Sequence, residues 1–134
     1  MKTLTVKWLQ KKQACSNGIK WLKEKFGKKA DVSKVKSALV KNKKWAWLEW
    51  LFYEGKLDGE YKSFYENGKL LEHCFYKGGK LNGEYKWFWA NGKLEEHCFY
   101  KDGELDGEYK SFRDNGKLEE HCFYKDGELI KEVK

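Results

Sequence analysis

No apolar run in the 134-residue sequence approaches the roughly 20 residues that a helix needs to cross a bilayer. The first residues, MKTLTVKWLQKK, also lack the apolar core and small-residue cleavage site of a secretory signal peptide. Four cysteines without such a signal indicate reduced thiols and a cytoplasmic protein without membrane insertion. Proline is absent and 17% of the residues are aromatic, so we expect large rings to supply much of the buried surface.

The net charge of +7 is divided unequally along the chain. Residues 1–50 contain 14 lysines, three acids and no arginine, a net charge of +11. Residues 51–134 contain 14 basic and 18 acidic residues, a net charge of −4. Regions of opposite charge usually have different roles or partners. We therefore expect two domains, a basic one over residues 1–52 and a repetitive one over 53–134.

A repeat of 24 residues fills the second region. The segment NGKLEEHCFYKDGEL at 91–105 returns unchanged at 115–129, and a near copy, NGKLLEHCFYKGGKL, lies at 67–81. Asn-Gly accepts positive φ at both central positions of a type I′ hairpin turn, and the aromatic-rich stretches between turns are typical of strands. Each copy is expected to form one β-hairpin. About three copies and a terminal strand would make a single-layer, twisted antiparallel β-meander.

The pairing within a hairpin bears on the adjacent His and Cys of each copy. A two-residue turn at 67–68 pairs Tyr65 with Leu70, Ser63 with Glu72, Lys62 with His73 and Tyr61 with Cys74. Because side chains alternate across a sheet, His73 and Cys74 should lie on opposite faces. Equivalent residues of successive copies are two strands, or about 9–10 Å, apart, too far to share a zinc ion or form a disulfide.

We therefore predict no metal site within the chain. The cysteines are expected to fill the better-buried face, and the histidines to lie beside lysines and glutamates on the other. The alternatives are a metal that bridges two molecules and a different strand register.

Three stretches of the repeat resemble a known family: YEGKLDGEYKSFYENGKL (53–70), YKGGKLNGEYKWFWANGKL (76–94) and YKDGELDGEYKSFRDNGKL (100–118). They are similar to the MORN repeat, in the antitoxin-type variant found in bacterial repeat proteins, over about residues 53–130. The resemblance implies a curved single-layer sheet that binds other macromolecules, in an antitoxin, immunity or host-interaction role. It implies no catalytic residue, because such repeats carry many unrelated functions.

The first region is helical in pattern. Residues 16–27, 30–42 and 43–55 have helical apolar spacing, with Ser16 and Asp31 as expected N-caps. The last of these segments is apolar nearly all round and should be buried against the sheet. We expect a three- or four-helix cap before the repeats, and hence an α+β fold.

Two short runs in this region also carry a resemblance: Ala-Cys-x-x-Gly-Ile-x-Trp at 14–21 and Trp-Ala-Trp-Leu at 45–48. They resemble a helical lead-in module, over about residues 14–50, that precedes repeat arrays in bacterial and phage proteins. That resemblance brings no established activity.

Positions at which the copies differ are the candidate binding site. The middle copy alone carries Trp87 and Trp89, where the other copies have Ser or have Tyr and Arg. Large aromatics are enriched in binding hot spots, and both are expected on one face with Tyr85, Leu94, Cys98 and Tyr100. The candidate partner-binding residues are Tyr65, Tyr85, Trp87, Trp89 and Arg113. The alternative is that these rings receive the N-terminal helices or a second copy of the chain in a homodimer.

Lysines are the other candidate contacts. Lys20, Lys23, Lys34 and Lys36 should face solvent on the polar sides of the helices, and clustered lysine attracts phosphate. Arginine, the usual reader of bases, is missing from this region. The lysines therefore fit a solvated surface, an acidic protein partner or a nucleic acid.

Residues arranged for catalysis are missing from the pattern. No glycine-rich phosphate loop precedes an expected helix, and no Ser-His-Asp or Cys-His set converges in the register above. The pairs Glu95-Glu96 and Glu119-Glu120 should alternate across the sheet and so form no facing carboxylate pair. We predict a non-enzymatic protein-interaction module without cofactor, and keep nucleic-acid binding by the helical region as the alternative.

Overall fold

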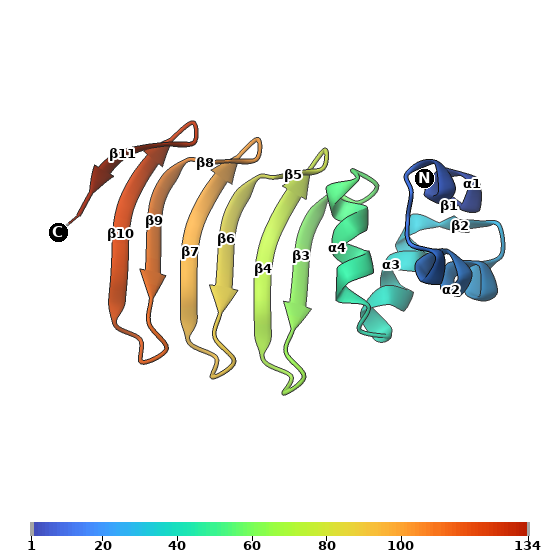
Figure 1. The fold of residues 1–134 in the computed structure, drawn as a ribbon, viewed down its shortest axis with the longest axis horizontal. Helices are drawn as coiled ribbons and strands as arrows, with labels where there is room; N and C mark the ends of the chain where they lie inside the picture. The colour runs from blue at the N-terminus through green and yellow to red at the C-terminus, as the bar shows by residue number, and fades with distance from the viewer. Residues whose placement is uncertain (1, 134) are drawn as a thin grey trace.

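The computed structural model describes residues 2–133 and is elongated (Figure 1). Four helices occupy its N-terminal end, and strands then follow side by side to the C-terminal end. Within these residues a short two-stranded sheet lies among the helices, and nine strands form one open antiparallel sheet. The expected α+β fold, with helices before a β-meander, is confirmed.

The helical part comprises β1 (Thr3–Thr5), α1 (Val6–Lys11), α2 (Ser16–Phe26), β2 (Lys29–Asp31), α3 (Val32–Lys41) and α4 (Trp45–Tyr53). The Asp31 carboxylate accepts a hydrogen bond from Ser33 N at 2.8 Å and caps α3 as expected. The expected cap at Ser16 is wrong. Ser16 is already the first helical residue of α2, and Cys15 occupies the capping position without a side-chain hydrogen bond.

Helix α4 joins the helices to the sheet. The Phe52 ring is 0 % exposed and lies 5.5 Å from the Tyr61 ring and 5.4 Å from the Tyr76 ring. Nearby, the Trp45 ring lies 5.7 Å from the Phe64 ring. The helix is thus buried against the first hairpin, as its apolar sequence predicts. It lies along the first edge strand, where unpaired backbone would otherwise invite pairing with another chain (Figure 1).

The sheet comprises β3 (Gly59–Phe64), β4 (Leu70–Lys77), β5 (Lys80–Leu81), β6 (Gly83–Phe88), β7 (Leu94–Lys101), β8 (Glu104–Leu105), β9 (Gly107–Phe112), β10 (Leu118–Lys125) and β11 (Glu128–Glu132). The strands follow one another across the sheet, with the short β5 and β8 pairing beside β4 and β7. Three expected pairs of the first hairpin are present: Tyr61 with Cys74, Lys62 with His73 and Ser63 with Glu72. The same register recurs in the other two hairpins.

The Asn-Gly turns differ from the expectation. Tyr65 N donates to Lys69 O at 2.8 Å and Gly68 N donates to Tyr65 O at 2.9 Å, so the loop has three residues, not two. Only Gly68 has positive φ, at 86°, and the Asn67 side chain instead accepts a hydrogen bond from Lys69 N. The predicted type I′ turn is therefore wrong.

This longer loop shifts the pairing by one residue near the turn. Phe64 pairs with Leu70, so the expected Tyr65–Leu70 pair is wrong, and a bulge separates it from the Ser63–Glu72 pair. In the middle hairpin, Leu94 pairs with Phe88 and thus lies on the face opposite Trp87, contrary to the expectation. Bulges at these positions recur in each hairpin.

Phe52 should be among the most important residues for stability. Replacing Phe52 by Ala removes a fully buried ring between α4 and the first hairpin, and we expect a loss of about 3–5 kcal/mol of unfolding free energy. Denaturant titration followed by circular dichroism measures this loss. Tyr53→Ala is the control, because that ring is 67% exposed and should change stability by less than about 0.5 kcal/mol. Equal losses in the two variants would contradict the role of Phe52.

Candidate functional site

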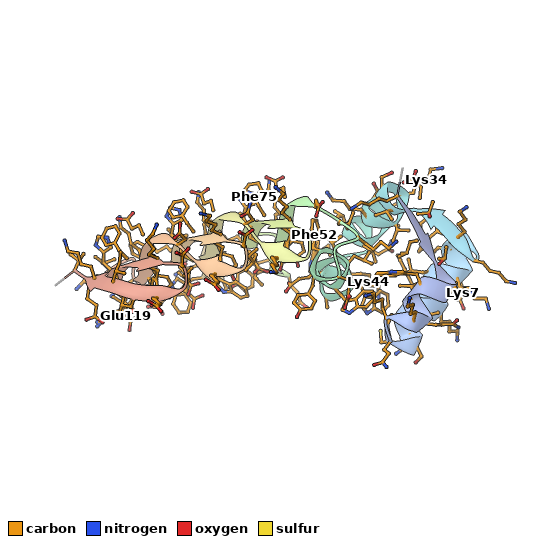
Figure 2. All side chains as sticks on the ribbon, turned by 90° about the horizontal axis from the view of Figure 1, so that it is seen from above. Lys7, Lys34, Lys44, Phe52, Phe75 and Glu119 are labelled. Atoms are coloured by element: carbon orange, nitrogen blue, oxygen red, sulfur yellow. The ribbon has the colours of Figure 1, made fainter. Side chains whose placement is uncertain are left out.

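The sheet has two chemically different faces. We call one the tyrosine face, formed by Tyr61, Glu72, Cys74, Tyr76, Tyr85, Trp87, Glu96, Cys98, Tyr100, Tyr109, Glu120, Cys122 and Tyr124. We call the other the histidine face, formed by Glu60, Lys62, His73, Phe75, Glu84, Lys86, His97, Phe99, Glu108, Lys110, His121 and Phe123. Figure 2 shows Phe75 projecting on one side of the sheet and Glu119 on the other.

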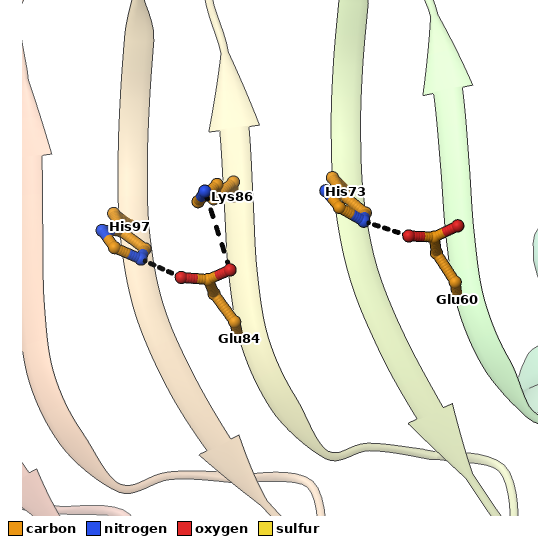
Figure 3. A network of polar contacts seen from close by, with 5 residues as sticks. All are labelled: Glu60, His73, Glu84, Lys86 and His97. Atoms are coloured by element: carbon orange, nitrogen blue, oxygen red, sulfur yellow. Dashed lines mark hydrogen bonds and ion pairs between the residues drawn. The ribbon is translucent and has the colours of Figure 1, made fainter.

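The histidine face carries one Glu–His pair per hairpin (Figure 3). His73 Nε2 lies 2.8 Å from Glu60 Oε2, and the same contact measures 2.9 Å in each of the next two hairpins. A lysine from the strand of the glutamate adds an ion pair, as Lys86 does with Glu84 at 3.6 Å. The hydrogen bond from the histidine lowers the pKa of each of these three glutamates below its ordinary value. The histidines therefore lie beside lysines and glutamates as expected.

The cysteines lie on the opposite face. Cys74, Cys98 and Cys122 are each 0 % exposed, and burial raises the pKa of the Cys98 thiol to about 12. They act as small buried fillers, as predicted. Among residues 2–133, no three His, Cys, Asp or Glu side chains come together in a way that could hold a metal ion. The absence of a metal site stays a prediction, which rests on the spacing of the histidines.

Glutamate–tyrosine contacts link successive hairpins across the tyrosine face. Tyr85 Oη donates to Glu72 at 2.9 Å, and Tyr109 Oη donates to Glu96 at 2.8 Å. Burial and the neighbouring Glu49 raise the pKa of Glu72, which is 6 % exposed, to about 7. These contacts are not among those predicted from the sequence. Their signal is a glutamate followed by a tyrosine 13 positions later, in two successive copies.

Trp87 lies at the centre of the tyrosine face. Its ring is stacked against that of Tyr85, with centroids 6.4 Å apart and planes inclined by 17°. Along the register it pairs with Glu72 on one side and Glu96 on the other. The indole is half-buried. The helices lie beyond β3 at one end of the sheet and not over β6, which carries Trp87 (Figure 1).

The other position at which the copies differ is occupied by Tyr65, Trp89 and Arg113. Its surroundings differ from those of Trp87. Tyr65 Oη donates to Phe88 O at 2.6 Å, and Trp89 Nε1 donates to Phe112 O at 3.2 Å. Both side chains thus donate a hydrogen bond to the backbone of the next hairpin, so both have a structural role. Arg113 is exposed. The structure brings Tyr85 and Trp87 together. It places Tyr65, Trp89 and Arg113 beside the Asn-Gly loops at 67–68, 91–92 and 115–116, an edge of the sheet that we call the Asn-Gly rim.

Adjacent glutamates in the bulges also lie differently from the expectation. Glu95 and Glu119 are the extra residues of two bulges and have no partner on the neighbouring strand of their hairpin. The next residue of each strand is paired, Glu96 with Trp87 and Glu120 with Ser111. Burial and the charge of Glu96 raise the pKa of Glu95. Figure 2 shows Glu119 on the side of the sheet opposite Phe75, and Glu119 and Glu120 line one groove with Ser111, His121, Glu132 and Val133. Each pair of adjacent acids therefore gathers on the tyrosine face and does not alternate across the sheet as predicted, because a bulge interrupts the alternation.

The candidate lysines fall into two groups. Lys20, Lys23 and Lys34 are exposed, and Figure 2 shows Lys34 projecting from the helical end. Lys36 is half-buried, with Nζ 5.6 Å from the centre of the Phe52 ring, so it packs on an aromatic side chain. No helix within residues 2–133 has the length and apolarity required to cross a membrane.

Comparison with known proteins gives two family matches. A family described as a MORN repeat variant matches residues 57–77, 81–102 and 105–133. A family described as the YdhT N-terminal domain matches residues 1–55. No curated protein and no solved structure matches the chain.

The pKa of Glu72 predicts a specific pH dependence. Because this pKa is about 7 in the folded protein and 4.5 ordinarily, the folded state binds the proton more tightly. The resulting stability is complete below pH 4.5 and is lost as the pH rises through about 7. Glu72→Gln keeps an acceptor for Tyr85 and lacks the titrating proton. We expect it to gain up to about 3 kcal/mol relative to the wild type between pH 5 and pH 8.

Denaturant titrations of both proteins at the two pH values measure this gain. Glu120→Gln, at the equivalent but exposed position, is the matched control and should show a smaller change. A wild type whose stability relative to Glu72→Gln is the same at both pH values would rule out a raised pKa for Glu72.

Proposed function

The chain belongs to the MORN repeat variant family, and from that premise we propose that it binds a protein partner through the tyrosine face. MORN repeats are generally interaction repeats and typically non-enzymatic. We propose that residues 53–134 form the binding domain and that residues 1–52 form a basic domain that caps its first edge. The proposed biological role is that of a cytoplasmic antitoxin, immunity or phage-type host-interaction protein.

One observation carries the proposal, namely the position of Trp87. In the other copies this place holds Ser63 and Ser111, so the repeat does not need a large ring there. The indole lies in the middle strands of the sheet, half-buried and stacked on Tyr85. A partner that covered it would bury a large, conformationally restricted apolar surface, the kind of contact that dominates binding energy.

Trp87→Ser tests the binding site with little risk to the fold, because the other copies carry serine at this position. We expect a partner that the tagged wild-type protein retains from lysate to bind this variant at least roughly tenfold more weakly. Calorimetry with the purified partner measures the difference. Phe99→Leu, on the histidine face, should leave the affinity unchanged. A folded Trp87→Ser protein with wild-type affinity would show that the partner binds elsewhere.

A second candidate function is nucleic-acid binding by the helical part, which the exposed Lys20, Lys23 and Lys34 favour. Charge reversal of these three to Glu should abolish binding of a labelled DNA duplex, and the wild-type affinity should fall steeply between low and moderate salt. Fluorescence anisotropy measures both effects. Charge reversal at Lys101 and Lys125, exposed on the repeats, is the control. Binding that survives the helical substitutions would exclude this function.

A further inference from the structure

Charges differ between the two faces of the sheet: the histidine face carries lysines together with Glu60, Glu84 and Glu108, and the tyrosine face carries glutamates. The strand lysines Lys62, Lys86, Lys110 and Lys131 all pair with residues of the histidine face. The charged strand residues that the register places on the tyrosine face are all glutamates: Glu72, Glu96, Glu120 and Glu132. Glu95 and Glu119, in the bulges, add two more carboxylates to this face. The tyrosine face is thus aromatic and acidic.

Trp87 lies where these two properties coincide. Glu72 and Glu96 flank it on the neighbouring strands, and Glu95 follows in the adjacent bulge. An indole face attracts a cation through its quadrupole, and ionised carboxylates beside it add charge attraction. Glu95 and Glu96 supply most of this attraction, because Glu72 is buried and has a pKa of about 7. A lysine or arginine side chain placed over Trp87 would be stabilised by both. An acidic segment would instead be repelled, and a purely apolar one would leave these carboxylates with less water around them.

We propose that the tyrosine face recognises a cationic segment of its protein partner, with a lysine or arginine side chain seated over Trp87 between the flanking glutamates. This inference rests on the proposed function and adds the chemistry of the partner. The Tyr85 and Tyr109 hydroxyls contribute by positioning: each donates to one flanking glutamate and orients that carboxylate beside the indole.

The test uses three peptides of equal length and spacing that carry arginine, neutral citrulline or glutamate at alternate positions. Each is titrated into the full-length, nitrogen-15-labelled protein, and the Trp87 indole resonance is followed by NMR, assigned through Trp87→Ser. We expect the arginine peptide to shift that resonance in a saturable way, and the other two to leave it unchanged.

The matched variant is Glu95→Gln with Glu96→Gln, which keeps an acceptor for Tyr109 and removes two charges. We expect it to bind the arginine peptide roughly tenfold more weakly. The wild-type affinity should persist when Lys20, Lys23 and Lys34 are changed to Glu, a control for contacts with the helices. The amide spectrum of each variant reports that the protein is folded.

Three results would overturn the inference. The first is an equal response to citrulline, and the second is an unchanged affinity in the double glutamine variant. The third is a Trp87 shift on raising the protein concentration alone, which would assign the face to a second copy. The proposed function is judged separately, by the effect of Trp87→Ser on partner affinity. A partner that needs Trp87 but tolerates the double glutamine variant would leave that function standing and refute the cationic segment.

Discussion

A single-layer sheet has no second layer to bury its faces, and the rest of this structure depends on how the strands are stabilised without one. Sideways contacts between hairpins take the place of a deep core. Tyr85 reaches back to Glu72, and Asn67 Nδ2 reaches forward to Ala90 O at 2.9 Å. Because the period is constant, each such contact recurs one hairpin further along, as the Asn91–Asp114 bond does. Hairpins therefore stabilise mainly their immediate neighbours, as in other repeat proteins.

The packing of helix α4 along β3, the first edge strand, meets the same need for burial in a single-layer sheet. Within residues 2–133, the sheet meets a conventional apolar core only at α4, where the Tyr61 and Tyr76 rings pack around Phe52. Farther along, the rings of the tyrosine face are partly buried against one another, as Tyr85 and Tyr100 are, while Cys98 and Cys122 among them are fully buried. Local stability should accordingly be greatest beside the helices, where buried apolar contacts are densest. The tyrosine face is therefore stable at the end beside the helices and has accessible aromatic side chains in the middle.

Much of the fold could be predicted from the repeat, because identical segments at a fixed spacing must adopt equivalent positions. The pairing of Lys62 with His73 is predicted from a two-residue turn, and it is correct because the bulge restores the register after the three-residue loop. The burial of Cys74 follows from the alternation of side chains across the sheet. The loop could not be predicted, because Asn-Gly suits both a two-residue and a three-residue turn. Contacts beyond the dipeptide, such as that of Asn67 with Ala90, accompany the longer form. The one-residue difference misplaced Leu94 and the paired glutamates, and with them the acidic character of the tyrosine face.

Successive hairpins are joined along the Asn-Gly rim by side chains that differ from one junction to the next. A phenol O–H from Tyr65 joins the first hairpin to the second, and an indole N–H from Trp89 joins the second to the third. Both donate to the same backbone atom of the next hairpin, the carbonyl oxygen of Phe88 or Phe112. Because the acceptor belongs to the backbone, it is present in every copy whatever its sequence. The rim position can therefore change from tyrosine to tryptophan without loss of the connection between hairpins.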